Sequence, residues 1–120
     1  MSKLVGAVSH HEREVEELRE DREFAVEYLK AALESLDDPD DRGAGLLMLR
    51  ALAEAYGGMG KVAAQAGISR ESLYRSLSPR GNPTLKTLLA VLNALGLRLS
   101  VMEPRKTAKR SGAGKKKAAA

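Results

Sequence analysis

Apolar side chains recur at steps of three and four residues along most of this chain, the spacing that places them on one face of an α-helix. The clearest series are Ala25, Tyr28, Leu29, Ala32, Leu33 and Leu36; then Leu46, Leu49, Leu52, Ala53 and Tyr56; then Leu85, Leu88, Leu89, Leu92 and Leu95. A weaker series, Val15 and Leu18, lies among glutamates and indicates a helix extension or a frayed end. These series predict a small all-α domain of four to five helices.

Turn-forming residues separate the helical series. The segment Asp37–Asp41 contains a proline, so it ends the first helical unit and offers N-cap residues to the next. Gly57 and Gly58 close the second unit. Asn82 is expected to cap the last helix and Pro83 to be its first residue, because proline fits the first helical position.

The last helix is expected to stop at Gly96, and a different pattern follows. Leu97, Leu99 and Val101 stand at alternate positions, the period of two that a short C-terminal strand would show. A lone strand needs a partner, and the most economical partner is the same strand of a second copy. A helical ending is the alternative, and the sequence does not choose between the two.

Length and composition exclude several classes of protein. A chain of 120 residues is one domain, or a small domain with tails. It has no cysteine, which excludes disulfide scaffolds and thiol catalysis, and no apolar run of about 18 residues, so we expect no membrane span. The short apolar N-terminus does not fit a secretory signal, and we therefore expect a soluble cytoplasmic protein.

The net charge of +4 conceals a gradient along the chain. Residues 1–54 hold fourteen acidic and seven basic residues, residues 55–103 hold two acidic and six basic, and residues 104–120 hold seven basic and no acidic. We divide the chain accordingly into an acidic N-terminal extension (1–20), a helical domain (21–103) and a basic tail (104–120), which we expect to be disordered. A basic half favours an anionic partner, although charged helix faces can also simply contact solvent.

The segment from Met59 to Leu77 carries the functional signal. It reads as two short helices joined by Gly67-Ile68-Ser69, which is the plan of a helix-turn-helix. Gly67 fits a turn that needs a positive φ, and Ser69 is placed to cap the second helix. The small Ala63 would allow close crossing of the helices. The apolar contacts are expected from Val62, Ala66, Ile68 and Leu73, with Leu77 packing where many such motifs use the preceding residue, here Ser76.

In such a motif the second helix enters the major groove of DNA. Its outward face would carry the residues that read bases: Ser69, Arg70, Glu71, Tyr74 and Arg75. Arg70 and Arg75 suit bidentate contacts with guanine, whereas Glu71 serves equally as a partner of the helix dipole and Tyr74 as a packing residue. A second set would contact phosphates and orient the domain: Lys61, Arg80, Asn82, Thr84 and Lys86.

Two strings in this region resemble a known family. Residues 58–78 read GMGKVAAQAGISRESLYRSLS and residues 81–88 read GNPTLKTL, and both are similar to the probable addiction-module antidote proteins, which are HigA-type antitoxins with a lambda-repressor-like helix-turn-helix. Residues 28–34 and 94–99 resemble the first helix and the ending of that family. The likeness covers roughly residues 24–101, and its more specific parts are the strings SRESLY and GNPT.

The resemblance implies a dimeric DNA-binding protein that represses its own operon and neutralises a small toxin of the RelE/ParE superfamily. A homodimer would place two recognition helices about 34 Å apart, so its operator on double-stranded DNA should be an inverted repeat. The chain departs from the family pattern in its longer acidic N-terminus, in the aspartates of residues 37–41 and in its basic tail. A stand-alone regulator without a toxin could use the same domain.

Other functions are less well supported by the sequence. His10 and His11 are adjacent, so they do not face one way on a helix, and no phosphate-binding glycine loop or nucleophile motif occurs. We therefore expect no enzyme activity, no catalytic residue, no metal site and no cofactor. The remaining alternative is a protein-interaction module whose acidic N-terminal helices bind a basic partner, with the helix-turn-helix kept as scaffold.

Overall fold

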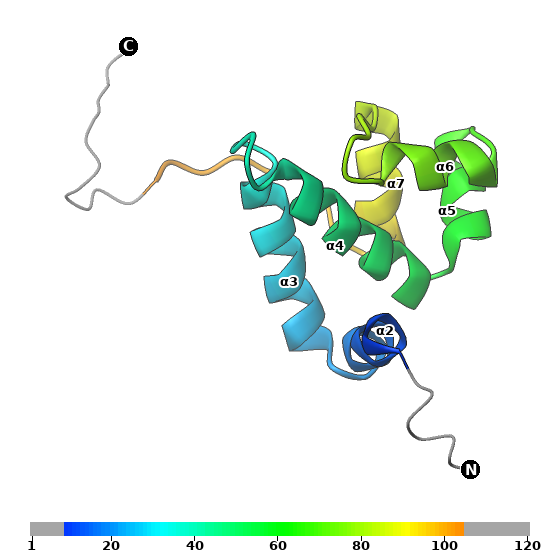
Figure 1. The fold of residues 1–120 in the computed structure, drawn as a ribbon. Helices are drawn as coiled ribbons and strands as arrows, with labels where there is room; N and C mark the ends of the chain where they lie inside the picture. Colours follow the sequence, from blue (N-terminus) through cyan, green and yellow to red (C-terminus); the bar gives the residue numbers. More distant parts are fainter. Residues whose placement is uncertain (1–8, 105–120) are drawn as a thin grey trace.

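The computed structural model describes residues 9–104 and places six α-helices and no strand among them (Figure 1). The helices are α2 (His10–Glu20), α3 (Arg22–Ser35), α4 (Arg42–Ala55), α5 (Met59–Ala66), α6 (Arg70–Ser76) and α7 (Leu85–Ala94). The all-helical prediction is confirmed. The prediction of four to five helices is wrong by one, because the polar stretch from Ser9 to Ser35 forms two helices instead of one.

Asp21 divides this stretch. Its backbone is extended, with φ −123° and ψ 99°, so it cannot continue α2. Its carboxylate accepts a hydrogen bond from the Phe24 backbone N–H at 3.0 Å and thereby caps α3. Ser9 caps α2 in the same way, in a capping box with Glu12. The upstream segment is therefore a separate helix with its own caps.

α4 is the central helix of the fold. It packs against α2 and α3 on one side and against α5 and α7 on the other (Figure 1). Leu46, Leu49 and Leu52 are the largest of its buried side chains, each at most 1% exposed. At Gly45 the backbone of α3 approaches closely, since a Cβ there would lie 2.8 Å from the Ala32 carbonyl oxygen. The core thus forms around the second apolar series of the sequence.

α2 is fastened to this core by apolar and polar contacts. Leu18 is fully buried, and its carbonyl accepts a hydrogen bond of 2.8 Å from the Tyr56 hydroxyl. The Tyr28 hydroxyl of α3 donates to the Glu14 carboxylate at 2.5 Å, and burial together with this hydrogen bond raises the pKa of Tyr28. His11 Nε2 lies 2.7 Å from the Glu54 carboxylate of α4. These contacts join α2 to both neighbouring helices.

The last helix begins two residues later than predicted and stops before the predicted glycine. Thr84, not Asn82, caps α7: its hydroxyl accepts from the Thr87 N–H at 3.2 Å, and Leu85, not Pro83, is the first helical residue. Asn82 and Pro83 precede the helix because the capping hydroxyl is supplied two residues later. α7 ends at Ala94 with Leu95 as its C-cap, and Gly96 follows at φ +75°, a conformation that glycine adopts readily.

The segment after Gly96 contains no regular secondary structure as far as Pro104. The alternatives of a strand and a helical ending are both wrong for these residues. Leu97 is half-buried against the core, whereas Leu99 is 55% and Val101 94% exposed. A strand needs a neighbouring strand, and the described part of the chain supplies none. The predicted disordered tail lies outside the described residues, apart from its first residue.

No helix between residues 9 and 104 combines the length and the apolar character needed to cross a membrane.

Candidate nucleic-acid interface

α5 and α6 are joined by the three residues that the sequence predicts. Gly67 ends α5 in the left-handed conformation, with φ +75° and ψ 27°. The N–H of Gly67 donates to the Ala64 carbonyl at 3.1 Å, and the N–H of Ile68 donates to the Ala63 carbonyl at 3.0 Å. These two bonds form a Schellman motif, which satisfies carbonyls at the end of α5. The predicted role of Gly67 is confirmed.

Ser69 begins α6 as its N-cap. Its hydroxyl accepts a hydrogen bond of 3.0 Å from the Ser72 N–H, as predicted. One side of the unit faces the core, where Val62, Ala63, Ala66, Leu73 and Leu77 are each at most 3% exposed. Leu77 therefore packs into the core as predicted. Ser76 does not, and its hydroxyl donates to the Ser72 carbonyl at 2.9 Å. The opposite side of α6 is left to solvent.

Four of the five side chains predicted to read bases are exposed. These are Ser69, Arg70, Glu71 and Arg75. Arg75 makes a hydrogen bond of 3.3 Å to the Ser72 hydroxyl one turn earlier, which aligns its guanidinium along α6. Tyr74 differs, because it is half-buried and packs against the core. Both arginines of α6 thus project outward.

Tyr74 contacts an arginine of α4 that sequence reasoning missed. The guanidinium carbon of Arg50 lies 5.2 Å from the centre of the Tyr74 ring, and Arg50 Nη2 donates to the Tyr74 carbonyl at 3.1 Å. The residues are 24 positions apart. Only the presence of an arginine within the apolar series of α4 could have drawn attention to Arg50.

The five predicted phosphate-contacting residues lie in two places. Lys61 is on α5, and the other four lie on the loop before α7 or in its first turn: Arg80, Asn82, Thr84 and Lys86. All five are exposed. The ammonium group of Lys86 lies over the α5–α6 turn, since a Cβ on Gly67 would be 3.1 Å from Nζ. The Thr84 hydroxyl is engaged in capping α7.

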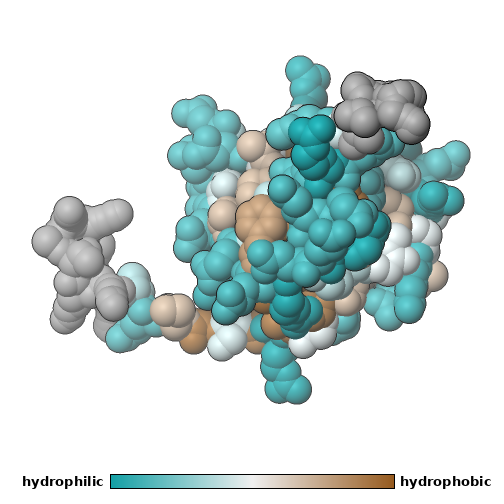
Figure 2. Space-filling model, turned by 90° about the horizontal axis from the view of Figure 1, so that it is seen from below, coloured by the Kyte–Doolittle hydropathy of each residue, from teal (hydrophilic) through white to brown (hydrophobic). Residues whose placement is uncertain are grey.

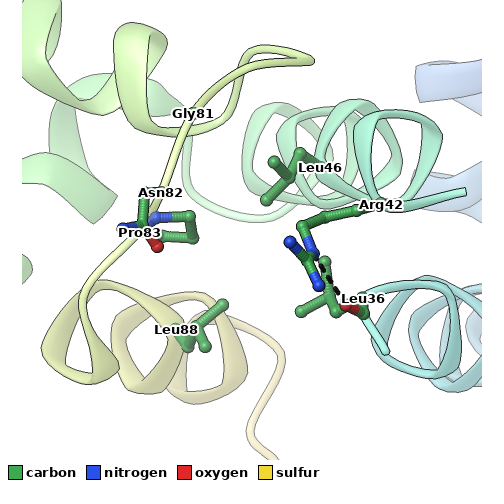
Figure 3. Close-up of a pocket in the computed structure, with 7 residues that line it drawn as sticks. All are labelled: Leu36, Arg42, Leu46, Gly81, Asn82, Pro83 and Leu88. Carbon is green, nitrogen blue, oxygen red and sulfur yellow. Dashed lines mark hydrogen bonds between the residues drawn. The ribbon is translucent and has the colours of Figure 1, made fainter. Parts of the chain in front are cut away.

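A hollow of about 180 Å³ separates the loop before α7 from the start of α4 (Figure 3). Leu36, Leu46, Pro83 and Leu88 contribute apolar walls. Arg42 reaches across one side, and its Nε donates to the Leu36 carbonyl at 2.8 Å. Sites for small ligands usually enclose at least about 300 Å³, so this hollow is too small to accept a typical cofactor.

Acidic residues outnumber basic ones on α2 and α3, whereas basic residues outnumber acidic ones on α5, α6 and α7. Exposed carboxylates gather on α2 and the start of α3: Glu12, Glu16, Glu17, Glu20, Glu23 and Glu27. The hydrogen bond to Glu16 and the charge of that neighbour raise the pKa of Glu20. Figure 2, which views the molecule from below Figure 1, shows a mostly hydrophilic face with a small hydrophobic patch at its centre. Cations predominate instead on α5, α6 and the start of α7.

No group of three or more potential metal-binding side chains occurs between residues 9 and 104. His11, one of the two adjacent histidines, is engaged with Glu54.

Comparison with known proteins identifies the family. The family model described as probable addiction module antidote protein matches residues 10–103, which include all six helices. A curated protein of Haemophilus influenzae, described as an uncharacterized protein, is 49% identical over 47 residues, which cover 39% of this chain and 48% of that protein. The chain thus spans about half the length of this relative. No solved structure matches the chain significantly.

The family match extends over more than three quarters of the chain, and it agrees with the resemblance carried by residues 58–78 and 81–88. The chain therefore belongs to the family of probable addiction module antidote proteins.

Proposed function

We propose that this protein is the antitoxin of a toxin–antitoxin module and a sequence-specific DNA-binding repressor of its own operon. The α5–turn–α6 unit would be a lambda-repressor-like helix-turn-helix, with α6 in the major groove. The observation that carries this proposal is the placement of Arg70 and Arg75 on α6. Both side chains are exposed, while Leu73 of the same helix is fully buried.

Charge supports the same proposal. Residues 55–103 carry six basic side chains and only two acidic ones, and five of the basic ones stand on α5, α6, α7 or the loop between α6 and α7. Cations that surround a groove-reading helix contact phosphates and orient the protein on the duplex. Lys61, Arg80 and Lys86 are the charged members of this set. The proposal needs no catalytic residue and no cofactor.

A homodimer is part of the proposal. Two copies of α6 would then lie about 34 Å apart, one turn of DNA, and the operator would be an inverted repeat. Sedimentation of the protein with and without a duplex from upstream of its own gene measures this stoichiometry. A complex of one copy per duplex at saturation would contradict the dimer.

Family membership supports a toxin partner, and we propose one of the RelE/ParE type in the cytoplasm. The exposed carboxylates of α2 and α3 favour a basic partner surface. They also support the second candidate, a protein-interaction module in which α5 and α6 are only scaffold. A stand-alone regulator without a toxin would use α6 alone.

Substitution of Arg70 and Arg75 by alanine, singly and together, tests DNA recognition. We expect each change to weaken binding to the duplex from upstream of the gene by about 1–3 kcal/mol, because each removes a contact to a base. Binding to an unrelated duplex should fall much less. Fluorescence anisotropy with both duplexes at one salt concentration measures the two affinities.

Arg19→Ala is the matched control, because it removes the same charge from an exposed arginine of α2. It should leave the preference for the upstream duplex unchanged. If the double variant Arg70→Ala/Arg75→Ala kept that preference, DNA recognition by α6 would be wrong. The interaction module would be favoured by two results together. The double arginine variant would keep its DNA binding, and a variant with Glu16 and Glu20 changed to lysine would no longer bind a co-expressed toxin.

A further inference from the structure

The C-terminus of α6 is held by a contact from outside that helix. The last four carbonyls of an α-helix lack partners within it. In α6 the Leu73 carbonyl accepts from the Leu77 N–H at 3.0 Å, and the Arg75 carbonyl accepts from the Ser78 hydroxyl at 2.8 Å. The Tyr74 carbonyl accepts instead from Arg50 Nη2 of α4, at 3.1 Å. A cation at this end also suits the negative pole of the helix dipole.

The guanidinium of Arg50 makes a second contact with the same residue. It lies over the Tyr74 ring, 5.2 Å from the ring centre, in cation–π geometry. Its Nε is buried and has no hydrogen-bond partner among the described residues. Arg50 therefore contacts both the backbone carbonyl and the ring of Tyr74, while its Nε donor stays without a partner among the described residues. Leaving a buried donor unpaired is costly, so a residue suited only to filling space would fit this position better.

α6 is short, so a small change in its tilt moves the side chains at its far end. The helix has seven residues and is about 10 Å long, so a tilt of about 10° would move its far end by about 2 Å. Among the helices, α6 packs chiefly against α5. Arg50 adds a directional contact from α4, the central helix.

We propose that Arg50 is a positioning residue for DNA recognition: it sets the orientation of α6 so that Arg70 and Arg75 meet bases at the same time. This inference rests on the proposed DNA-binding function. Arg50 would act through Tyr74 and would not itself touch DNA, since its Nη2 and its cationic face are both engaged with Tyr74.

Two substitutions test the role of Arg50. Arg50→Met keeps an unbranched apolar side chain but removes the hydrogen bond and the charge. Arg50→Lys keeps the charge and a hydrogen-bond donor group but loses the planar group that stacks on the ring. We expect Arg50→Met to weaken binding to the duplex from upstream of the gene about tenfold, equivalent to about 1.4 kcal/mol, and Arg50→Lys to lie between it and the wild type.

The ratio of the affinities for upstream and unrelated duplexes separates positioning from a structural role. It is measured at a temperature where circular dichroism shows each variant fully folded. Lower stability alone would leave this ratio unchanged, whereas misaligned arginines lower it. The Arg19→Met variant controls for the lost charge, and Arg70→Ala marks the loss from one missing base contact.

The outcomes distinguish a failure of the positioning role of Arg50 from a failure of the proposed DNA recognition. If the wild type showed no preference for the upstream duplex, DNA recognition and the role of Arg50 would both be overturned. If the wild type showed the preference, Arg70→Ala lost it and Arg50→Met retained it, only the role of Arg50 would be overturned. Should Arg50→Met fail to fold, the Arg50→Lys ratio decides: a wild-type value contradicts positioning by the planar guanidinium, and a reduced value supports it.

Discussion

Two glycines near α6 meet different physical requirements. Gly67 has a φ of +75°, a conformation that costs other residues energy because of their Cβ. Gly81 needs no unusual φ, but a Cβ there would lie 2.0 Å from the Ser76 carbonyl oxygen. The first requirement could be predicted from the turn pattern. The second could not, because it depends on how the loop before α7 folds back on the end of α6.

We therefore expect Gly81→Ala to lower the free energy of unfolding by about 1–3 kcal/mol, the usual cost of forcing extra volume into a packed site. Gly60→Ala is the control, since a Cβ at Gly60 meets nothing within 4 Å and alanine favours helix. This control should raise the same free energy by up to about 1 kcal/mol. Urea unfolding followed by circular dichroism measures both. Equal effects of the two substitutions would contradict the close approach at Gly81.

Most of the helices could be predicted from local sequence patterns. The series of α3, α4 and α7 give their positions, and Gly67 with Ser69 gives the boundary between α5 and α6. The break at Asp21 was missed because aspartate occurs both within helices and at caps, and neither glycine nor proline marks the site. The cap of α7 was misplaced because Asn82 and Thr84 are both good capping residues.

The candidate site was predictable only in part, because contacts between distant residues leave no local pattern in the sequence. Arg70 and Arg75 follow from their spacing on one helix, and spacing is visible in a sequence. The Arg50–Tyr74 contact joins two helices through tertiary packing, so no local pattern encodes it. The same holds for the position of Lys86 over the α5–α6 turn. For Leu97 to Val101, alternation alone was misleading because it cannot supply a neighbouring strand.

α2 offers a test of how far the cooperative fold extends. Leu18 is fully buried, so Leu18→Ala should lower the free energy of unfolding by about 2–5 kcal/mol through lost burial and a residual cavity. Glu17→Ala, at the neighbouring exposed position of α2, should change it by less than about 0.5 kcal/mol. Thermal unfolding of the full chain measures both. A Leu18→Ala protein as stable as the wild type would show that α2 does not fold together with the rest.

For the whole molecule, the uneven charge predicts a salt dependence. Residues 104–120 carry seven basic residues, and each phosphate that such a residue neutralises adds about 0.9 to the slope of log affinity against log salt. If all seven contact DNA, removing residues 105–120 should reduce that slope by about 6. A full-length variant with glutamine at these seven positions should match the truncated protein. An unchanged slope in both would show that this segment does not contact DNA.

The contacts of α4 have a consequence for regulation. Arg50, which holds α6, and Glu54, which pairs with His11 of α2, are four residues apart and so share one face of α4. A protein that displaced α2 would disturb α4 one helical turn from the anchor of α6. If occupancy at α2 changed the affinity at α6, thermodynamic reciprocity would require DNA to change the affinity for that protein by the same factor. Binding of the proposed toxin at α2 and binding of the proposed operator at α6 would then be coupled through α4.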